Sequence, residues 1–419
     1  MHWQPSLPDH YHRLTPDELA DRIADRRRRL GDRLVILGHH YQADEVVRHA
    51  DLTGDSLKLS QLAAGVADEK PVEFVVFCGV HFMAETADLL TPDHVQVLLP
   101  DLSAGCSMAD MADFDEAAHC WETITGTLGK LGWNGRIVPV TYVNSTAAIK
   151  AFVGEHGGSC CTSSNADQVF EWALAGGTKP AEPGEDIKLL FLPDQHLGRN
   201  TAAKYGIDVS AAAPLYDPRL RRQGEPLGGM TPDEVLDARV ILWAGHCSVH
   251  KLFKPEHCDA VRAANRDLEP GQQPMQVIVH PECAKEVVDK ADLAGSTEFI
   301  IKTIEASEPG SRWAVGTEHH LVNRLRQSAA ARGVEVRILS ECQCLCTTMY
   351  RIDQPHLLWV LDGLCGIGTG AEKGSDLNFE KDGGPVVVRN RISVHPEVRA
   401  AALKAVNRML DLVGAPARD

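Results

Sequence analysis

Three cysteines stand at the ends of short apolar runs that lie far apart in the chain. Cys106 follows LLPDLSAG, Cys247 follows VILWAGH, and Cys346 closes the segment VRILSECQCLC. Thiolates are the usual ligands of iron–sulfur clusters, and three are one short of the four that a four-iron cluster takes. Three converging cysteines would therefore hold a cluster with one iron open to a substrate. The turns at Gly105 and Gly245 suit such a site, because their backbone N–H groups can bond cluster sulfurs.

A second group of cysteines suggests an alternative metal site. Cys342, Cys344 and Cys346 alternate along the chain, so in an extended segment their side chains share one face and could form a local zinc or redox site. Zinc sites more often use paired C-x-x-C knuckles, which makes a zinc finger the weaker hypothesis. Five further cysteines are interpreted as small buried hydrophobic residues. These are Cys78, Cys120, Cys160, Cys258 and Cys365.

The elements that position these residues repeat one pattern: a short β-branched run, a polar turn and an amphipathic segment. The runs are RLVILG, VEFVVFCG, VQVLLP, RIVPVTYV, IKLLFLP, RVILWAG, MQVIVH, RWAVGT and VEVRIL. Their near-continuous apolar character predicts parallel strands that are buried on both faces. The alternation of strands and helices predicts an α/β fold, in which ligands bind beyond the carboxyl ends of the strands.

Polar side chains gather at these predicted strand ends. His39 and Tyr41 follow RLVILG, Tyr142 and Asn144 follow RIVPV, and His280 and Glu282 follow VIV. Further such residues are His81, Glu85, Asp194, Gln195, His196, His246, Glu318, His319 and His320. This sorting indicates a ligand site along the strand ends.

Composition narrows the class of protein. The chain has 419 residues, of which 44% are hydrophobic, and a formal charge of -16, which disfavours a general nucleic-acid surface. The one basic block, 26–29, is interpreted as a solvated face of a helix that begins after Thr15. The N-terminus lacks the apolar stretch of a secretion signal, no run is long enough to span a bilayer, and a cytoplasmic location is expected.

Segment 366–385 is rich in glycine and charge and is expected to be an exposed insertion before a last helix over 396–413.

A series of longer motifs occurs in order from about residue 35 to residue 360. They are LGHHYQ, TGDSLKLS, FCGVHFMAETA, LLPDLSAGCSMADM, VTYVNSTAAIKA, CTSSNA, FLPDQHLGRNTA, WAGHCSVH, VHPEC, GSTEF and CLCTTM. In type and order they resemble the quinolinate synthase family, iron–sulfur enzymes of NAD biosynthesis. Several of these motifs are long, so the resemblance is far more specific than a single glycine-rich loop.

The resemblance implies three pseudo-symmetric αβα, Rossmann-like domains with parallel sheets around a central cavity. The expected bounds are 1–102 plus 347–419, 103–244 and 245–346. A 4Fe-4S cluster is implied, held by Cys106, Cys247 and Cys346. The last is chosen over Cys344, the reserve, because the family's third ligand begins a C-x-x-M pattern that ends here at Met349.

The implied reaction condenses iminoaspartate with dihydroxyacetone phosphate, loses phosphate and two waters, and closes a pyridine ring. The matching motifs assign Glu282 as the general base, with His280 beside it, and they assign Tyr41, Tyr142 and Asn144 as further catalytic residues. The residues assigned to substrate binding are His39, Ser56, Ser163, Ser296 and Thr297. The serines and Thr297 lie at strand-to-helix turns, which bind anions but also serve as ordinary helix caps. The expected partners include a transient contact with the enzyme that makes the imine. The alternatives are a cluster-dependent hydro-lyase and a zinc or redox-sensing protein.

Overall fold

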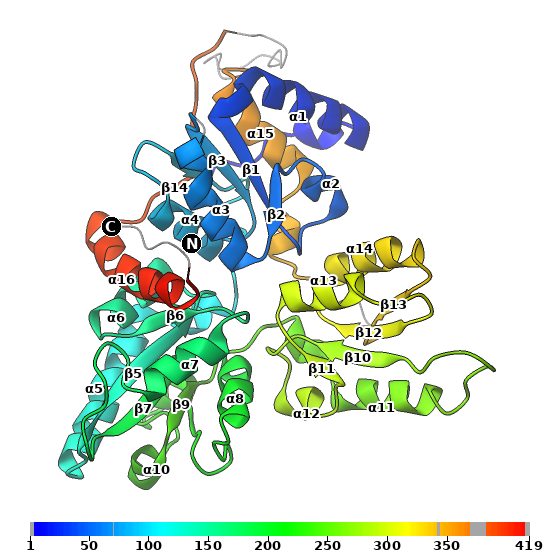
Figure 1. Cartoon of the computed structure of the whole chain (residues 1–419). Coiled ribbons are helices and arrows are strands. Elements are labelled where there is room, and N and C mark those ends of the chain that lie inside the picture. Colours follow the sequence, from blue (N-terminus) through cyan, green and yellow to red (C-terminus); the bar gives the residue numbers. More distant parts are fainter. Residues whose placement is uncertain (1–3, 70, 342–343, 369–382, 415–419) are drawn as a thin grey trace. The chain divides into compact units, whose positions relative to one another are not determined.

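The computed structural model describes residues 4–69, 71–341, 344–368 and 383–414. Its contacts divide the chain into two compact units. Unit 1 comprises Met1–Cys106 and Cys346–Val394, and unit 2 comprises Ser107–Leu345 and His395–Asp419. Unit 1 is therefore built from two segments that are far apart in the sequence (Figure 1).

Unit 1 contains a five-stranded sheet in the order β14-β4-β3-β1-β2. Its strands are β1 (Leu34–His39), β2 (Leu52–Gly54), β3 (Phe74–Cys78), β4 (Gln96–Leu98) and β14 (Arg391–Ile392). Its helices are α1 (Pro16–Leu30), α2 (Asp44–Val47), α3 (Ser56–Glu69), α4 (His81–Leu90) and α15 (Gln354–Leu364), with short 3-10 helices at Tyr11–Arg13, Gly31–Arg33 and Met349–Arg351. All neighbouring strands are parallel except β14, which runs antiparallel to β4.

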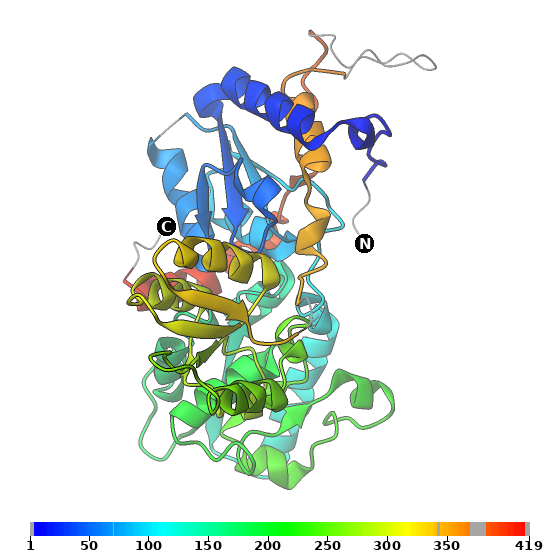
Figure 2. The same cartoon turned by 90° about the vertical axis from the view of Figure 1, so that its right-hand side faces the viewer.

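Helix α1 begins where the sequence predicts and packs against α15, as both views show (Figure 2). The Thr15 hydroxyl accepts the backbone N–H of Glu18, whose carboxylate in turn accepts the N–H of Thr15. The basic block differs from expectation at one residue. Arg26 is buried and donates to Asp362 over 2.7 Å, since this position of the helix faces α15 rather than solvent.

Unit 2 contains a five-stranded sheet in the order β6-β5-β7-β9-β8 and a four-stranded sheet in the order β11-β10-β12-β13, and all its paired strands are parallel. The first has β5 (Gly135–Tyr142), β6 (Ser159–Cys161), β7 (Asp186–Leu192), β8 (Leu215–Tyr216) and β9 (Val240–Trp243). The second has β10 (Gln276–Val279), β11 (Leu293–Ala294), β12 (Arg312–Gly316) and β13 (Glu335–Ile338).

Helices cover both faces of each sheet in unit 2, so the strands are buried as their apolar runs predict. Beside the first sheet lie α5 (Phe114–Lys130), α6 (Ala147–Glu155), α7 (Ala166–Leu174), α8 (Gln195–Lys204), α9 (Pro218–Arg222), α10 (Pro232–Asp237) and α16 (Pro396–Leu412). Beside the second lie α11 (Pro255–Ala264), α12 (Lys285–Val288), α13 (Thr297–Glu305) and α14 (His319–Ala330). Short 3-10 helices lie at Ala109–Met111 and His250–Leu252.

The three sheets share one strand order. In each, the second strand along the chain lies at one side of the first and the third strand at the other: β2-β1-β3-β4, β6-β5-β7-β9 and β11-β10-β12-β13. This order places a topological switch point between the first and third strands, where α/β sheets bind ligands. The predicted α/β class with three Rossmann-like sheets is confirmed. The sequence missed the short strands β2, β6, β8, β11 and β14, whose two or three residues carry little periodic signal.

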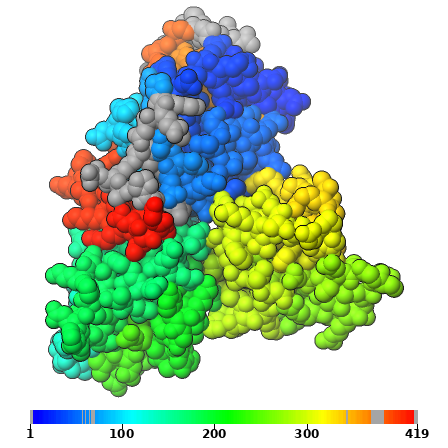
Figure 3. Space-filling view, viewed as in Figure 1, coloured from blue at the N-terminus to red at the C-terminus, as the bar shows by residue number. Residues whose placement is uncertain are grey.

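The last helix, α16, packs against α6 within unit 2 (Figure 3). The approach is close at Gly154, where a Cβ would collide with the carbonyl oxygen of Ala401. This differs from the expected grouping of 347–419 with the first domain, since contacts with α6 assign the helix to unit 2. The remaining domain boundaries and the central cavity stay predictions. Most of the expected insertion, 369–382, lies outside the described residues.

Among the residues that the structure describes, none of the helices combines the length and the apolar character needed to cross a membrane.

Candidate active site

The predicted site residues occupy equivalent places in the three sheets. A pair spaced by two residues follows or ends each first strand: His39 and Tyr41 at β1, Tyr142 and Asn144 at β5, and His280 and Glu282 at β10. The predicted serine and threonine ligands follow the second strands, β2, β6 and β11, and the predicted cysteine ligands follow the strands that pair with the third, β4, β9 and β13. The predicted site therefore repeats once in each sheet, at its carboxyl end.

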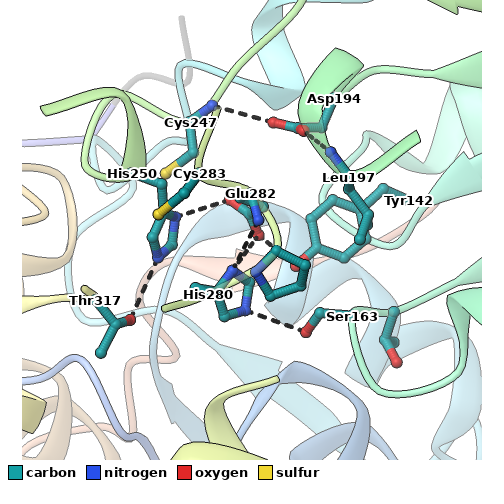
Figure 4. A network of polar contacts seen from close by, with 12 residues as sticks. Tyr142, Ser163, Asp194, Leu197, Cys247, His250, His280, Glu282, Cys283 and Thr317 are labelled. Carbon is teal, nitrogen blue, oxygen red and sulfur yellow. Dashed lines mark hydrogen bonds and ion pairs between the residues drawn. The ribbon is translucent and has the colours of Figure 1, made fainter. Parts of the chain in front are cut away.

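Glu282 is the centre of a buried network in unit 2 (Figure 4). The hydroxyl of Tyr142 donates to Glu282 Oε1 over 2.5 Å, and His250 Nδ1 lies 3.1 Å from Oε2. The other ring nitrogen of His250, Nε2, lies 3.3 Å from the Thr317 hydroxyl. The sequence thus brings together carboxylate, phenol and imidazole from both sheets of unit 2, which is an arrangement able to hold and move a proton.

His280 lies beside this network with its ring stacked on that of His250, the centroids 4.4 Å apart. Its Nδ1 accepts the backbone N–H of Glu282 over 3.3 Å, so the ring proton is placed on Nε2, which donates to the Ser163 hydroxyl over 3.2 Å. Burial and the nearby His250 lower the pKa of His280 to about 3. His280 is therefore neutral at pH 7 and acts as a hydrogen-bond donor rather than a cation.

Two buried acids of unit 2, Glu282 and Asp194, differ in charge because of their surroundings. Burial opposes ionisation of Glu282, but His250, His280 and the hydrogen bonds from His250 and Tyr142 outweigh it and lower its pKa to about 2. Burial and then the charge of Glu282 raise the pKa of Asp194 well above its usual range. Because like charges at close range disfavour double ionisation, the carboxylate charge belongs to Glu282.

In unit 1, the residues at the end of β1 adopt a local arrangement like that at β10. His39 is buried, its Nδ1 accepts the backbone N–H of Tyr41 over 3.1 Å, and the two rings meet edge to face with centroids 4.8 Å apart. The same i to i+2 contact joins Glu282 to His280. Both histidines are thereby fixed in orientation by their own backbone.

The predicted anion-binding residues lie at or next to helix N-termini, as their turns predict. Ser296 caps α13 by accepting the N–H of Phe299, Thr297 is the first residue of α13, and Ser56 is the first of α3. Ser163 lies before α7 in a turn in which Asn165 Oδ1 accepts the N–H of Thr162. The capping role left open for these residues is therefore seen at Ser296.

Asn144 lies shortly before α6, and the structure assigns the cap of that helix to a different residue. Thr146 accepts the N–H of Ile149 at the start of α6. The Oδ1 of Asn144 is buried and has no hydrogen-bond partner among the described residues. Since buried polar atoms are normally hydrogen-bonded, this oxygen or amide group is well placed to meet a ligand.

The cysteines fall into two classes of burial. Cys106, Cys247 and Cys346 are half-buried, and so is Cys365, whereas the other described cysteines are buried. Burial raises the pKa of Cys78 and Cys160 to about 12, and that of Cys365 to about 11. Because metal ligation needs the thiolate, such cysteines are poor ligands. Cys344, the reserve ligand, is fully buried, and Cys342 lies outside the described residues.

Sequence reasoning did not single out His250, Thr317 or the role of Asp194. Asp194 caps α8 by accepting the N–H of Leu197 over 2.7 Å and also accepts the N–H of Cys247 over 3.2 Å. His250 had a readable signal, because it stands three residues after Cys247 and residues at this spacing lie on one side of a helical turn. Thr317 carried no such signal.

Comparison with known proteins shows the family of the chain. The family model for quinolinate synthetase A protein matches residues 21–372. The chain belongs to this family. Proteins called quinolinate synthase are similar over nearly their whole length: one from Acidobacterium capsulatum is 49% identical, covering 97% of this chain and 96% of the relative, and one from Nocardioides sp. is 48% identical, covering 96% and 91%. A third, from Halalkalibacterium halodurans, is 48% identical over 97% and 96%.

The quinolinate synthetase A family consists of iron–sulfur enzymes, and the cysteine chemistry of this chain suits such a cofactor. The three predicted ligands each follow the strand that pairs with the third strand of their sheet, and they are half-buried, whereas all the other described cysteines except Cys365 are buried. Cys106 and Cys346 belong to unit 1 and Cys247 to unit 2. That their sulfurs meet at one cluster stays a prediction.

Proposed function

We propose that this chain makes quinolinate from iminoaspartate and dihydroxyacetone phosphate, with a 4Fe-4S cluster held by Cys106, Cys247 and Cys346. Quinolinate synthesis for NAD biosynthesis is the activity of the family to which the chain belongs, and it identifies the enzyme as a transferase. The substrates, the ligand set and the residue roles are our assignments. A cluster with three protein thiolates supplies an open iron that acts as a Lewis acid on a substrate oxygen.

The observation that carries the proposal is the position of the base. Ligand atoms of Cys247, the proposed cluster ligand, and of Glu282 lie within 4.8 Å of each other. Glu282 is 3% exposed yet has a pKa lowered to about 2, so it is ionised at neutral pH. An ionised carboxylate next to a metal ligand is what the removal of a proton from a bound keto compound requires.

The other residues have roles that follow from their contacts. Tyr142 donates to Glu282 Oε1 and holds the carboxylate in place. Neutral His280 donates its Nε2–H to the Ser163 hydroxyl. The same N–H can donate to a substrate oxygen that takes the place of this hydroxyl. Asn144, with its buried amide oxygen, and Tyr41 and His39 in unit 1 are assigned to bind substrate oxygens.

The negative groups of the substrates are assigned to the strand-to-helix turns. Ser56, Ser163, Ser296 and Thr297 lie at or next to the N-termini of α3, α7 and α13, where unpaired N–H groups and the helix dipole favour anions. These turns bind phosphate or carboxylate without a positive net charge, which reconciles anionic substrates with a chain of charge -16.

Further parts of the proposal rest on the family and the sequence. We assign the enzyme to the cytoplasm and include a transient contact with the enzyme that supplies iminoaspartate. We expect neither nucleic acid nor a membrane as a partner.

Substitution of the cysteines tests the cluster assignment. Anaerobic protein should carry about four irons per chain and a broad visible absorption band. Cys106→Ala, Cys247→Ala and Cys346→Ala should each lose the iron, whereas Cys120→Ala, at a buried position, should keep it. Full iron content in Cys247→Ala would refute the assignment. Retention in both Cys106→Ala and Cys247→Ala with loss in Cys346→Ala would favour the local zinc or redox site instead.

Product analysis separates the reaction from its nearest alternative. A cluster-dependent hydro-lyase would dehydrate a hydroxy acid and form no quinolinate from the two proposed substrates. Quinolinate formation by the wild-type protein, measured beside simple dehydration, therefore decides between them.

A further inference from the structure

Three possible metal ligands of different kinds lie together inside unit 2. One ligand atom each from Cys247, His250 and Glu282 lies within 4.8 Å of the other two (Figure 4). His250 and Glu282 are 1% and 3% exposed, and Cys247 is half-buried. A thiolate, an imidazole and a carboxylate form a set that suits zinc. We propose that these three side chains bind one divalent cation of the zinc type in protein that lacks its cluster.

The distances agree with a tetrahedral ion. With metal–nitrogen and metal–oxygen bonds of about 2.0 to 2.1 Å, the two ligand atoms of a tetrahedron lie about 3.3 Å apart. His250 Nδ1 and Glu282 Oε2 are already 3.1 Å apart. The sulfur of a zinc thiolate lies about 3.6 Å from its neighbours, so Cys247, whose sulfur lies within 4.8 Å of both other ligand atoms, completes the set by moving about 1 Å at most.

Neighbouring hydrogen bonds leave the right atoms to face the ion. The Thr317 hydroxyl, 3.3 Å from His250 Nε2, can accept a proton from that nitrogen and so leave the lone pair on Nδ1. Tyr142 donates to Glu282 Oε1, which leaves Oε2 for the metal. Such outer contacts orient ligands in metal sites and fix the histidine tautomer.

The backbone holds Cys247 and His250 on one turn. The N–H of Cys247 donates to the buried Asp194, and the N–H of Lys251 donates to the carbonyl of Cys247. The C-x-x-H spacing therefore presents both side chains to Glu282 on the neighbouring loop. With three protein ligands, the fourth position of a tetrahedral ion is left for water.

The ion and the cluster exclude each other, because both use the sulfur of Cys247. Binding replaces the proton of the Cys247 thiol, which leaves to solvent, and His250 binds the ion through Nδ1 with its ring proton on Nε2. Zinc-bound protein is therefore unable to load a cluster until the ion is removed. This inference goes beyond the proposed function: the metal site itself does not rest on it, whereas its exclusion of the cluster does.

Metal binding to cluster-free protein tests the inference. Chelator-treated, reduced full-length protein is titrated anaerobically with Zn²⁺ and, as an optical probe, with Co²⁺. One ion should bind per chain, and Co²⁺ should give a thiolate charge-transfer band with tetrahedral visible bands. His250→Gln should weaken binding at least about tenfold, and Thr317→Val, which keeps all three ligands, should weaken it about tenfold.

The double variant Cys106→Ala with Cys346→Ala is the matched control. It removes two of the proposed cluster ligands and should bind Co²⁺ as the wild type does. Unchanged binding by His250→Gln, or loss of binding in the double variant, would overturn the inference, since the ion would then belong to the cluster cysteines. If circular dichroism shows that His250→Gln is unfolded, the Co²⁺ spectrum of the wild-type protein provides the test. A spectrum without a thiolate charge-transfer band would overturn the inference. The cluster assignment is tested separately, by the iron content of Cys106→Ala. Failure of the cluster proposal can therefore be told apart from failure of the zinc-site proposal.

Discussion

At the scale of single residues, the site depends on how buried groups divide their charges. Glu282 is ionised because its contacts with His250 and Tyr142 outweigh its burial, and His280 is neutral because burial and His250 lower its pKa to about 3. Asp194 has a raised pKa, and its side chain accepts hydrogen bonds from the backbone N–H groups of Leu197 and Cys247. A base and a neutral donor side by side suit proton removal from a bound substrate.

Glu282→Gln should keep the cluster and lose turnover. The amide preserves the shape of the side chain but accepts no proton, so kcat should fall at least about 100-fold. The measurement is quinolinate formation together with the visible absorption of the cluster. Glu286→Gln, an exposed position in the next helix, is the control and should be near wild type. Normal turnover in Glu282→Gln would remove its role as base.

The acid sensitivity of folding can be predicted from His196. Burial, His246 and Arg199 lower its pKa to about 4, so between pH 6.5 and 4 the unfolded chain binds a proton that the folded chain does not. Stability is therefore full above pH 6.5 and is lost as pH falls toward 4, by at most about 3 kcal/mol. The midpoint of thermal unfolding, measured between pH 6.5 and pH 4, should fall less in His196→Gln than in the wild-type protein. An equally steep fall would show that other groups cause it.

At the scale of elements, two stretches of the chain encode the same turn. Segments 45–54 and 286–295 read EVVRHADLTG and EVVDKADLAG. In both, an aspartate accepts a backbone N–H from the first strand of its sheet: Asp51 from Ile36 over 2.8 Å, and Asp292 from Val277 over 2.7 Å. This internal repeat explains why β1 and β10 present their polar pairs in the same way.

Helix α8 has to pack closely on its sheet, because its N-terminus carries Asp194 beside Cys247. A Cβ at Gly198 would lie 2.6 Å from the Phe191 ring and 2.7 Å from Leu242. Gly198→Ala should therefore lower the free energy of unfolding by about 1 to 3 kcal/mol through overpacking.

Gly126→Ala in α5 is the matched control for that change. It is also a helical glycine, but a Cβ there would meet nothing within 4 Å. It should raise stability by about 0.5 to 1 kcal/mol, because alanine favours the helix. Chemical denaturation measures both variants, and equal effects would contradict the packing argument.

At the scale of the whole molecule, unit 1 is closed by contacts between distant parts of the chain. Asp362 in α15 accepts Arg26 Nε over 2.7 Å and the Tyr11 hydroxyl over 2.8 Å, and both contacts are buried. These bonds join the segment after Cys346 to the N-terminal helices, so they stabilise the unit in which two of the predicted cluster ligands lie.

Asp362→Ala should lower the free energy of unfolding by about 3 kcal/mol, since it leaves a buried guanidinium and a buried phenol without their acceptor. Glu73→Ala removes the partner of Arg33 in an exposed pair of the same unit and should change the thermal midpoint little. Thermal unfolding of both proteins is the measurement. A small effect of Asp362→Ala would mean that Asp25 alone is enough to hold Arg26.

The sequence alone determined the parallel α/β class, the nine strands formed by its apolar runs and the polar residues at their ends. It did so because apolar runs, turns and motifs are local patterns. Only the tertiary structure decided that Tyr142 meets Glu282, 140 residues away, that His250 and Thr317 complete this network, that Arg26 is buried, and that α16 joins unit 2. Contacts of this kind depend on which faces of the elements pack together, and no local pattern of residue types records that choice.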